Sequence, residues 1–369
     1  MDSEKKTEDL FWNLRVRGLS PYVPGEQPKD RQFIKLNTNE NPYPPSPKVI
    51  EAIQKSVNDR LRLYPDPECI EFREAIAKRY NVNVEQVFVG NGSDEILAFA
   101  FGAFFESGQG TGKEAEASSV LFPDITYSFY PVYAALWDIP YSVVPLREDF
   151  SIDLNDYKKP SGGAVFPNPN APTGIAVPLD DILYLAEFLE KKGKVLIIDE
   201  AYAAFGAGSV VPYIEKYQNL LTVHTLSKSA SLAGLRAGFA IGNKKLIEGL
   251  RRIRDSFNSY TLDRLALAGA AAAIMDTEYY AKTNIKVVNT RERIAKSLRD
   301  IGFTVLPSSA NFLFIKAPQT SGEKLFTSLR EKGILARHFK KDKIADYLRV
   351  SIGTDAEMDK FLVVCREII

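Results

Sequence analysis

The sequence predicts an α/β fold, with a mainly parallel central sheet in a large domain and a smaller α+β domain beside it. Two observations support this class. Between about residues 46 and 240, short runs that are apolar throughout alternate with segments of helical spacing, as expected for strands covered on both faces. The last hundred or so residues instead combine long helical patterns with short extended runs. We expect a large domain over 46–260 and a small domain over 261–369, which the N-terminal segment 1–45 joins.

The expected strands of the large domain are marked by six apolar runs. These runs lie at residues 87–89, 120–122, 164–166, 195–198, 220–223 and 238–241. Each of the first five ends in a loop that holds Gly, Asn, Pro, Asp or Ser residues. Open α/β sheets bind ligands at the carboxyl ends of their strands, so we expect the chemistry in these loops.

The small domain opens with a helical pattern in which Val287, Ile294, Leu298 and Ile301 recur. Extended runs are expected at 303–306, 311–315, near 334 and at 348–352, with helices at 323–332 and at the C-terminus. The N-terminal forty or so residues are rich in Pro and Asn, and we expect them to lie across both domains.

Composition excludes several classes of function. Lys plus Arg and Asp plus Glu each number 47 among 369 residues, and this neutral balance argues against a protein that coats nucleic acid or an anionic membrane. Two cysteines and two histidines are too few for a disulfide framework or an evident metal site. The charged N-terminus lacks the apolar stretch of a signal peptide, and no segment approaches the ~18 apolar residues of a membrane span. We therefore expect a cytoplasmic protein.

The segment 225–238 is the most informative part of the chain. Lys228 comes soon after an apolar run, between small hydroxyl residues, where burial allows an amine to attack a carbonyl. Thr225, Ser227 and Arg236 would then donate hydrogen bonds to a nearby phosphate. A surface lysine at the start of a helix explains the segment equally well when it is considered alone.

Asp199 ends a strand-like run of four apolar residues. An ionised carboxylate is costly to bury there unless a cation faces it, and a protonated pyridine nitrogen is such a cation. Tyr202, three residues later, is placed to offer its hydroxyl to a phenolate oxygen on the same ring. The alternative is that Asp199 only caps the helix that follows.

Residues 90–95, with the sequence Gly-Asn-Gly-Ser-Asp-Glu, stand between a strand and an apolar helix. Backbone amides at such a helix start form a ready anion site, and glycines allow a phosphate to approach closely. An ordinary helix cap would look similar. Tyr127 follows the next apolar run and is placed to stack on a planar ring, although isolated aromatic residues more often serve packing.

Arg349 lies within an apolar run of the small domain. A guanidinium group binds a carboxylate or phosphate through two parallel hydrogen bonds, so Arg349 is a candidate clamp for a substrate across the domain cleft. On a sheet edge the same arginine would simply be solvated.

Together these residues resemble the fold-type-I pyridoxal phosphate enzymes, and within that group the histidinol-phosphate aminotransferases. The likeness runs nearly end to end. It is carried by residues 21–25 (PYVPG), 37–42 (NTNENP), 64–67 (YPDP), 170–174 (NAPTG), 199–202 (DEAY), 227–236, 309–313 (SANFL) and 349–353 (RVSIG).

The resemblance implies that Lys228 bonds covalently to pyridoxal 5'-phosphate, with Asp199 on the pyridine nitrogen and Tyr202 on the ring oxygen. It implies that Tyr127 stacks on the ring. It further implies that the phosphate is held by Thr225, Ser227, Arg236 and the amides of Ser93 and Asp94.

The resemblance also implies a homodimer with shared sites, because Tyr64 matches a position that reaches the cofactor phosphate of the neighbouring subunit. Arg337 and Arg349 match substrate-binding arginines, and Tyr22 matches a contact to the substrate phosphate. The family often has asparagine where this chain has Ala171. We expect Asn170 to make the bond to the ring oxygen instead.

The implied reaction is transamination between histidinol phosphate and 2-oxoglutarate, yielding imidazole acetol phosphate and glutamate. An aromatic amino acid aminotransferase and a decarboxylase of threonine phosphate are the alternatives within the cofactor class. A cofactor-binding module of a transcription regulator would need a DNA-binding domain or a basic stripe, and the neutral charge balance speaks against it.

Overall fold

A seven-stranded sheet forms the centre of the computed structural model, which describes residues 11–23, 25–28, 32–108 and 117–369. The strand order is β2–β8–β7–β6–β5–β3–β4. The strands are β2 (Val87–Asn91), β3 (Val120–Pro123), β4 (Tyr141–Val144), β5 (Gly163–Pro167), β6 (Val195–Asp199), β7 (Leu220–Thr225) and β8 (Ala237–Gly242). β8 pairs antiparallel with β2 and β7, and the other pairings are parallel, so the predicted class is confirmed.

All six apolar runs of the large domain form strands of this sheet. β4 was not predicted. It lies at the edge of the sheet next to β3, where Tyr141 and Val143 are exposed, so it lacks the continuous apolar character of a strand covered on both faces.

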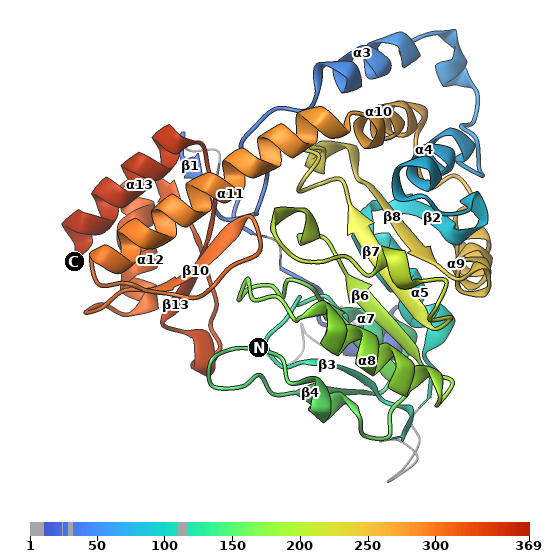
Figure 1. The fold of residues 1–369 in the computed structure, drawn as a ribbon, viewed down its shortest axis with the longest axis horizontal. Coiled ribbons are helices and arrows are strands. Elements are labelled where there is room, and N and C mark those ends of the chain that lie inside the picture. Colours follow the sequence, from blue (N-terminus) through green and yellow to red (C-terminus); the bar gives the residue numbers. More distant parts are fainter. Residues whose placement is uncertain (1–10, 24, 29–31, 109–116) are drawn as a thin grey trace.

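Helices cover both faces of the sheet (Figure 1). Along β2, Val87 and Val89 point to one face and Phe88 to the other, as the two-residue period of a strand requires. The first face packs against α3 (Pro47–Ser56), α4 (Ile70–Tyr80), α8 (Leu179–Glu190) and α10 (Arg264–Met275). The second packs against α5 (Gly92–Phe104), α7 (Tyr130–Trp137) and α9 (Lys244–Phe257).

The C-terminal part forms a second layer around an antiparallel sheet in the order β12–β13–β10–β9. Its elements are α11 (Thr277–Asp300), β9 (Thr304–Val305), β10 (Phe312–Lys316), α12 (Gly322–Glu331), β11 (Ile334–Leu335), β12 (Arg337–His338), β13 (Tyr347–Ser351) and α13 (Asp355–Ile368). The long helix α11 leads into it from α10 (Figure 1). β12 was not predicted because it has only two residues, both partly exposed.

The N-terminal segment contains the short helix α2 (Leu14–Gly18) and the strand β1 (Ile34–Lys35). β1 pairs in parallel with β11, which joins this segment to the C-terminal layer. Single 3₁₀ turns occur at Asp59–Arg62, Val84–Gln86, Leu154–Tyr157, Ala203–Phe205, Val211–Tyr213, Ala233–Leu235 and Asp342–Ile344.

The division into two domains stays a prediction, but packing bears on where its boundary falls. α10 follows the expected boundary at 260 and yet packs on α3 and α4, which belong to the large domain. This contact favours a boundary at the start of α11. None of the helices in the described ranges has the length and apolar character needed to cross a membrane.

Candidate active site

A cavity of ≈ 270 Å³ lies at the carboxyl ends of β5, β6 and β7, between the central sheet and the C-terminal layer. It brings together twelve of the fourteen residues that the sequence singled out. These are Tyr22, Ser93, Asp94, Tyr127, Asp199, Tyr202, Thr225, Ser227, Lys228, Arg236, Arg337 and Arg349. Asn170 and Tyr64 do not line it.

Asp199 is the last residue of β6, and only 5% of its surface is exposed. Its Oδ1 accepts a hydrogen bond from the Ala201 amide at 3.1 Å, and the Tyr130 hydroxyl lies 3.4 Å from Oδ2. Burial, together with the charge of Asp94, raises the pKa of Asp199 to about 7. No basic side chain in the described part of the chain forms an ion pair with it, so a cation in the cavity would complete the site.

Lys228 stands three residues after the end of β7, and its side chain points into the same cavity. Its Nζ donates to the carbonyl oxygen of Thr38 at 3.0 Å. Burial and the positive charge of Arg349 lower the pKa of Lys228 to about 8. The neutral amine, which is the nucleophilic and basic form, is therefore much more populated near neutral pH than in an ordinary lysine.

Hydrogen-bond donors gather at the start of α5. Arg236 pairs with Asp94 at 3.0 Å, and the hydroxyls of Thr225 and Ser227 lie 3.0 Å apart. A Cβ atom at Gly238 would lie 2.8 Å from the Ser93 nitrogen, so glycine is required for β8 to pass this close to the helix start. Backbone amides, two hydroxyls and a guanidinium form a cradle suited to a phosphate.

Aromatic side chains line the wall between this cradle and the C-terminal layer. The Tyr127 hydroxyl donates a hydrogen bond to Asp94, which orients the tyrosine toward the cradle. Tyr22 stacks on Phe129 with ring centroids 4.3 Å apart and an interplanar angle of 28°. Their π faces supply apolar surface for a planar ligand.

Two arginines of the C-terminal layer face the cavity from neighbouring strands. Arg337 on β12 is directly opposite Arg349 on β13. Burial and the charge of Arg337 lower the pKa of Arg349. The Nε of Arg349 is buried and has no hydrogen-bond partner within the described residues. Like charges facing each other across a strand pair are destabilising, and a bound anion would relieve this.

Asn170 and Tyr64 lie elsewhere. The Asn170 amide donates to the carbonyl oxygen of Ile125 and accepts from Thr126, both at 3.0 Å, so it is turned away from the cavity, and Ala171 lines the wall instead. Tyr64 is 78% exposed and stacks on Tyr260.

Sequence reasoning missed residues 37–39 as part of the site. Asn37 and Thr38 line the cavity, and Asn39 contacts Tyr202 behind it. The available signal was a run of polar residues directly after Leu36 in a segment expected to cross both domains. Tyr130 was also missed, because nothing distinguishes it in sequence from a core tyrosine.

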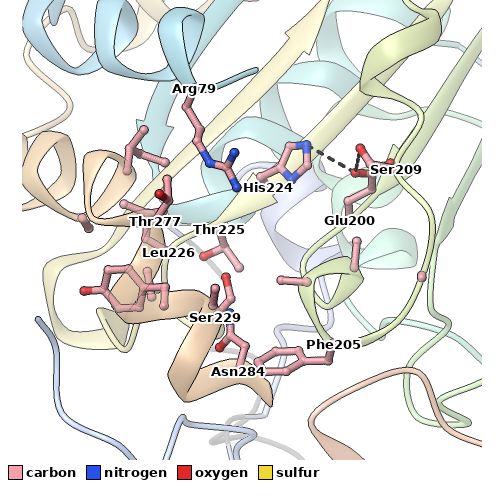
Figure 2. Close-up of a pocket in the computed structure, with 18 of the residues that line it drawn as sticks. Arg79, Glu200, Phe205, Ser209, His224, Thr225, Leu226, Ser229, Thr277 and Asn284 are labelled. Atoms are coloured by element: carbon pink, nitrogen blue, oxygen red, sulfur yellow. Dashed lines mark hydrogen bonds and ion pairs between the residues drawn. The ribbon is translucent and has the colours of Figure 1, made fainter. Parts of the chain in front are cut away.

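A second, larger cavity of ≈ 650 Å³ is shown in Figure 2. Thr225 lines both cavities. Its polar wall includes Glu200, whose carboxylate accepts from the Ser209 hydroxyl at 2.6 Å and lies 3.5 Å from His224. Burial raises the pKa of Glu200 to about 7 and lowers that of His224 to about 3. The Ser209 hydrogen bond ties the loop after β6 back to its own first residue. Apart from Thr225, no predicted site residue lines this cavity.

Comparison with known proteins decides the family. The family model of aminotransferase class I and II matches residues 31–364. The chain belongs to this family. A histidinol-phosphate aminotransferase of Clostridium acetobutylicum is 53% identical to this aminotransferase over 359 residues, which are 97% of this chain and 99% of the relative. One from Clostridium beijerinckii is 52% identical, with 95% and 94% covered.

Solved aminotransferases share the fold. The histidinol-phosphate aminotransferase of Sinorhizobium meliloti, solved in complex with pyridoxal-5'-phosphate, superposes with a TM-score of 0.85 at 24% identity, covering 98% of this chain and 99% of that one. A mutant aspartate aminotransferase of Thermus thermophilus gives 0.80 at 20% identity, covering 97% and 99%.

Aminotransferases of this class use pyridoxal phosphate as their cofactor, and the chemistry of the cavity fits it. The buried Asp199 carboxylate has no ion-pair partner among the described residues and suits a protonated ring nitrogen. The cradle at the start of α5 suits the phosphate, and Lys228 between them suits the aldehyde.

Proposed function

We propose that this aminotransferase converts histidinol phosphate and 2-oxoglutarate to imidazole acetol phosphate and glutamate, a step of histidine biosynthesis. The observation that carries this substrate class is the pair Arg337 and Arg349, which face one cavity from opposite positions on neighbouring strands. Both substrates are small and water-soluble, which supports the cytoplasmic location expected from the sequence.

The paired arginines suit a phosphate better than a single carboxylate. Two guanidinium groups bring two positive charges, and a phosphate monoester carries a charge of about −1.5 to −2 near neutral pH. Glutamate, the product amino acid, carries two carboxylates and can use the same pair. A substrate such as phenylalanine would leave one of the two arginines without an anion.

Bound pyridoxal phosphate supplies an electron sink for the charge that develops at the amino-bearing carbon. We assign Asp199 to hold the ring nitrogen in its protonated form and Tyr202 to donate to the ring oxygen. Thr225, Ser227, Arg236 and the Ser93 and Asp94 amides would hold the phosphate, and Tyr127 would stack on the ring.

We assign Lys228 two tasks: it binds the cofactor covalently and, once released, its Nζ removes the proton from the amino-bearing carbon of the substrate. The lowered pKa of Lys228, caused by burial and Arg349, suits a base that operates near neutral pH. Positioned proton transfer of this kind is worth ~10²- to 10⁴-fold in rate.

A half-reaction scan tests the substrate assignment. The yellow, cofactor-loaded enzyme is mixed separately with histidinol phosphate, glutamate, phenylalanine and phosphothreonine, and the loss of the visible band is followed. We expect rapid bleaching with histidinol phosphate and glutamate. Faster bleaching with phenylalanine than with histidinol phosphate would favour an aromatic amino acid aminotransferase, and release of carbon dioxide from phosphothreonine would favour a decarboxylase.

We further propose a homodimer in which Tyr64 serves the site of the neighbouring subunit. Tyr64 stacks on Tyr260, both side chains are exposed, and Leu61 and Leu63, close to Tyr64 in sequence, are exposed as well. Clustered exposed apolar side chains typically mark an interface. The patch adjoins the phosphate cradle, because the carbonyl of Thr261, the neighbour of Tyr260, accepts a hydrogen bond from Asn91 directly before α5.

A further inference from the structure

Three consecutive residues of the N-terminal segment each bond to a different residue of the site. The contacts are Arg349 Nη2 to the Asn37 carbonyl at 3.1 Å, Lys228 Nζ to the Thr38 carbonyl at 3.0 Å, and Asn39 Nδ2 to the Tyr202 hydroxyl at 3.0 Å. In these three contacts with the site, only Asn39 contributes a side-chain atom. Its identity therefore decides what the contact does, whereas a backbone carbonyl is present at any residue.

Every polar group of Asn39 is bonded. Its backbone N–H donates to the Ser351 hydroxyl at 2.8 Å, and its Oδ1 accepts from that same hydroxyl at 2.9 Å. Its carbonyl oxygen accepts from the Asn311 amide at 3.0 Å. Only 1% of Asn39 is exposed, and its φ of 56° is a left-handed conformation that asparagine tolerates better than most residues.

The hydrogen bonds also fix which way the Asn39 amide faces. The Ser351 oxygen already accepts the Asn39 backbone N–H, so its own proton needs an acceptor, and Oδ1 is in place for it. The opposite amide orientation would put Nδ2 against Ser351 and remove that acceptor. Nδ2 must therefore face Tyr202.

This polarity has a consequence for Tyr202. Because the Tyr202 oxygen accepts from Asn39, its proton is left to point elsewhere, and Tyr202 lines the cavity. We propose that Asn39 is a positioning residue that holds the Tyr202 hydroxyl as a donor toward the ring oxygen of the bound cofactor. The inference rests on the role assigned to Tyr202 in the proposed function.

The contact matters more here because Asn170, the residue expected to bond to the ring oxygen, does not line the cavity. Ala171 lines the cavity where the family often has asparagine, and the amide of Asn170 is bonded to Ile125 and Thr126. Asn39 also joins Tyr202 to the C-terminal layer, since Ser351 lies two residues after Arg349, on the same face of β13. The donor to the ring and the arginine for the substrate are thereby both held by one short stretch of chain, through the Asn39 side chain and the Asn37 carbonyl.

The test is a double-mutant cycle with Asn39→Gly and Tyr202→Phe, and with Asn39→Asp as a second variant. Glycine adopts φ of 56° without strain and removes the amide. Aspartate keeps the acceptor for Ser351, but its carboxylate would accept a hydrogen bond from the Tyr202 hydroxyl instead of donating one to it. Asn81→Gly is the matched control, because Asn81 also has a positive φ, of 54°, and is an exposed residue at the end of α4.

The readout is the pH midpoint of the change in visible absorption of the cofactor-loaded protein, with cofactor affinity measured alongside. The negatively charged ring oxygen stabilises the proton on the nearby Lys228 nitrogen. A hydrogen bond donated to this oxygen disperses its negative charge and so weakens that stabilisation. When the hydrogen bond is lost, the nitrogen keeps its proton to higher pH. We expect Asn39→Gly, Asn39→Asp and Tyr202→Phe each to raise the midpoint by about one pH unit, and Asn81→Gly to leave it unchanged.

The cycle separates the possible failures. In the Tyr202→Phe background, replacing Asn39 should add no further shift. An equal shift in both backgrounds, or no shift on replacing Asn39 while Tyr202→Phe moves the midpoint, overturns the inference and leaves the role of Tyr202 intact. No shift in Tyr202→Phe itself overturns the role of Tyr202 and the inference with it.

Discussion

The Nζ of Lys228 donates to the carbonyl oxygen of Thr38 at 3.0 Å, across a separation of 190 residues in sequence. The partner is a neutral carbonyl, so it holds the amine in place without the strong stabilisation of the charged form that a carboxylate would give. The pKa of Lys228 accordingly falls to about 8 through burial and the charge of Arg349. The lysine is thus both fixed in position and easily deprotonated.

Replacing Lys228 with alanine should abolish covalent attachment of the cofactor and lower turnover by at least ~10²-fold, because the base is lost. The phosphate cradle and Asp199 remain, so pyridoxal phosphate should still bind. After borohydride reduction, mass spectrometry should find the cofactor on residue 228 of the unaltered protein and on no residue of the variant. Lys245→Ala, at an exposed lysine of α9, is the control and should behave like the unaltered protein. Full turnover by Lys228→Ala would refute the assignment.

Stability of the cofactor-free protein should depend on Asp199 in a defined direction. Its pKa is raised from 3.8 to about 7, so the protonated carboxyl stabilises the fold most below pH 3.8, and this contribution is lost as the pH rises to about 7. The unfolding temperature of the cofactor-free protein should therefore fall less between pH 5 and 8 in Asp199→Asn, whose amide does not titrate. Calorimetry checks this, with Asp300→Asn at an exposed position as control. Identical slopes in all three proteins would contradict the raised pKa.

Arg236 should discriminate between cofactors with and without a phosphate. Its guanidinium lies beside Ser227 and Asp94 at the start of α5, where lysine would keep the charge but lose the two-pronged hydrogen bond. We expect Arg236→Lys to weaken pyridoxal phosphate binding about tenfold and to leave the binding of unphosphorylated pyridoxal nearly unchanged. Equal weakening for both ligands would indicate a general distortion of the cavity instead.

The sequence predicted those parts of the fold and of the site that depend on residues close together along the chain. Asp199 and Lys228 could be placed because each follows a buried apolar run, and such runs form strands whose ends meet at one edge. Asn39 and Tyr202 lie 163 residues apart, and no local pattern indicates that their side chains meet. The orientation of Asn170 was also beyond local reasoning, because it depends on Ile125 and Thr126 in another loop.

The substrate assignment predicts that Arg337 matters most for phosphorylated amines. Removing one of two guanidinium groups leaves a phosphate with about half of its compensating charge. Arg337→Gln should lower kcat/KM for histidinol phosphate by ~10- to 100-fold and change that for phenylalanine much less. Steady-state kinetics with both amines decide this, and equal losses for both would show that Arg337 acts on folding or on the cofactor rather than on the phosphate.

The shared-site dimer can be tested by restoring activity in mixed dimers. Tyr64 is 78% exposed and does not line the cavity of its own chain, so its assigned partner is the cofactor phosphate of a second copy. We expect Lys228→Ala and Tyr64→Ala each to be strongly impaired when purified alone, the second at limiting cofactor. In a hybrid dimer, the Tyr64→Ala subunit supplies a site with an unaltered Lys228. That site receives an unaltered Tyr64 from the Lys228→Ala subunit and is therefore complete. Unfolding and refolding an equimolar mixture should therefore regain activity, because half of the dimers formed at random are hybrids with one complete site. If Tyr64 acted within its own subunit, every site of the hybrid would carry a defect, and mixing would restore nothing.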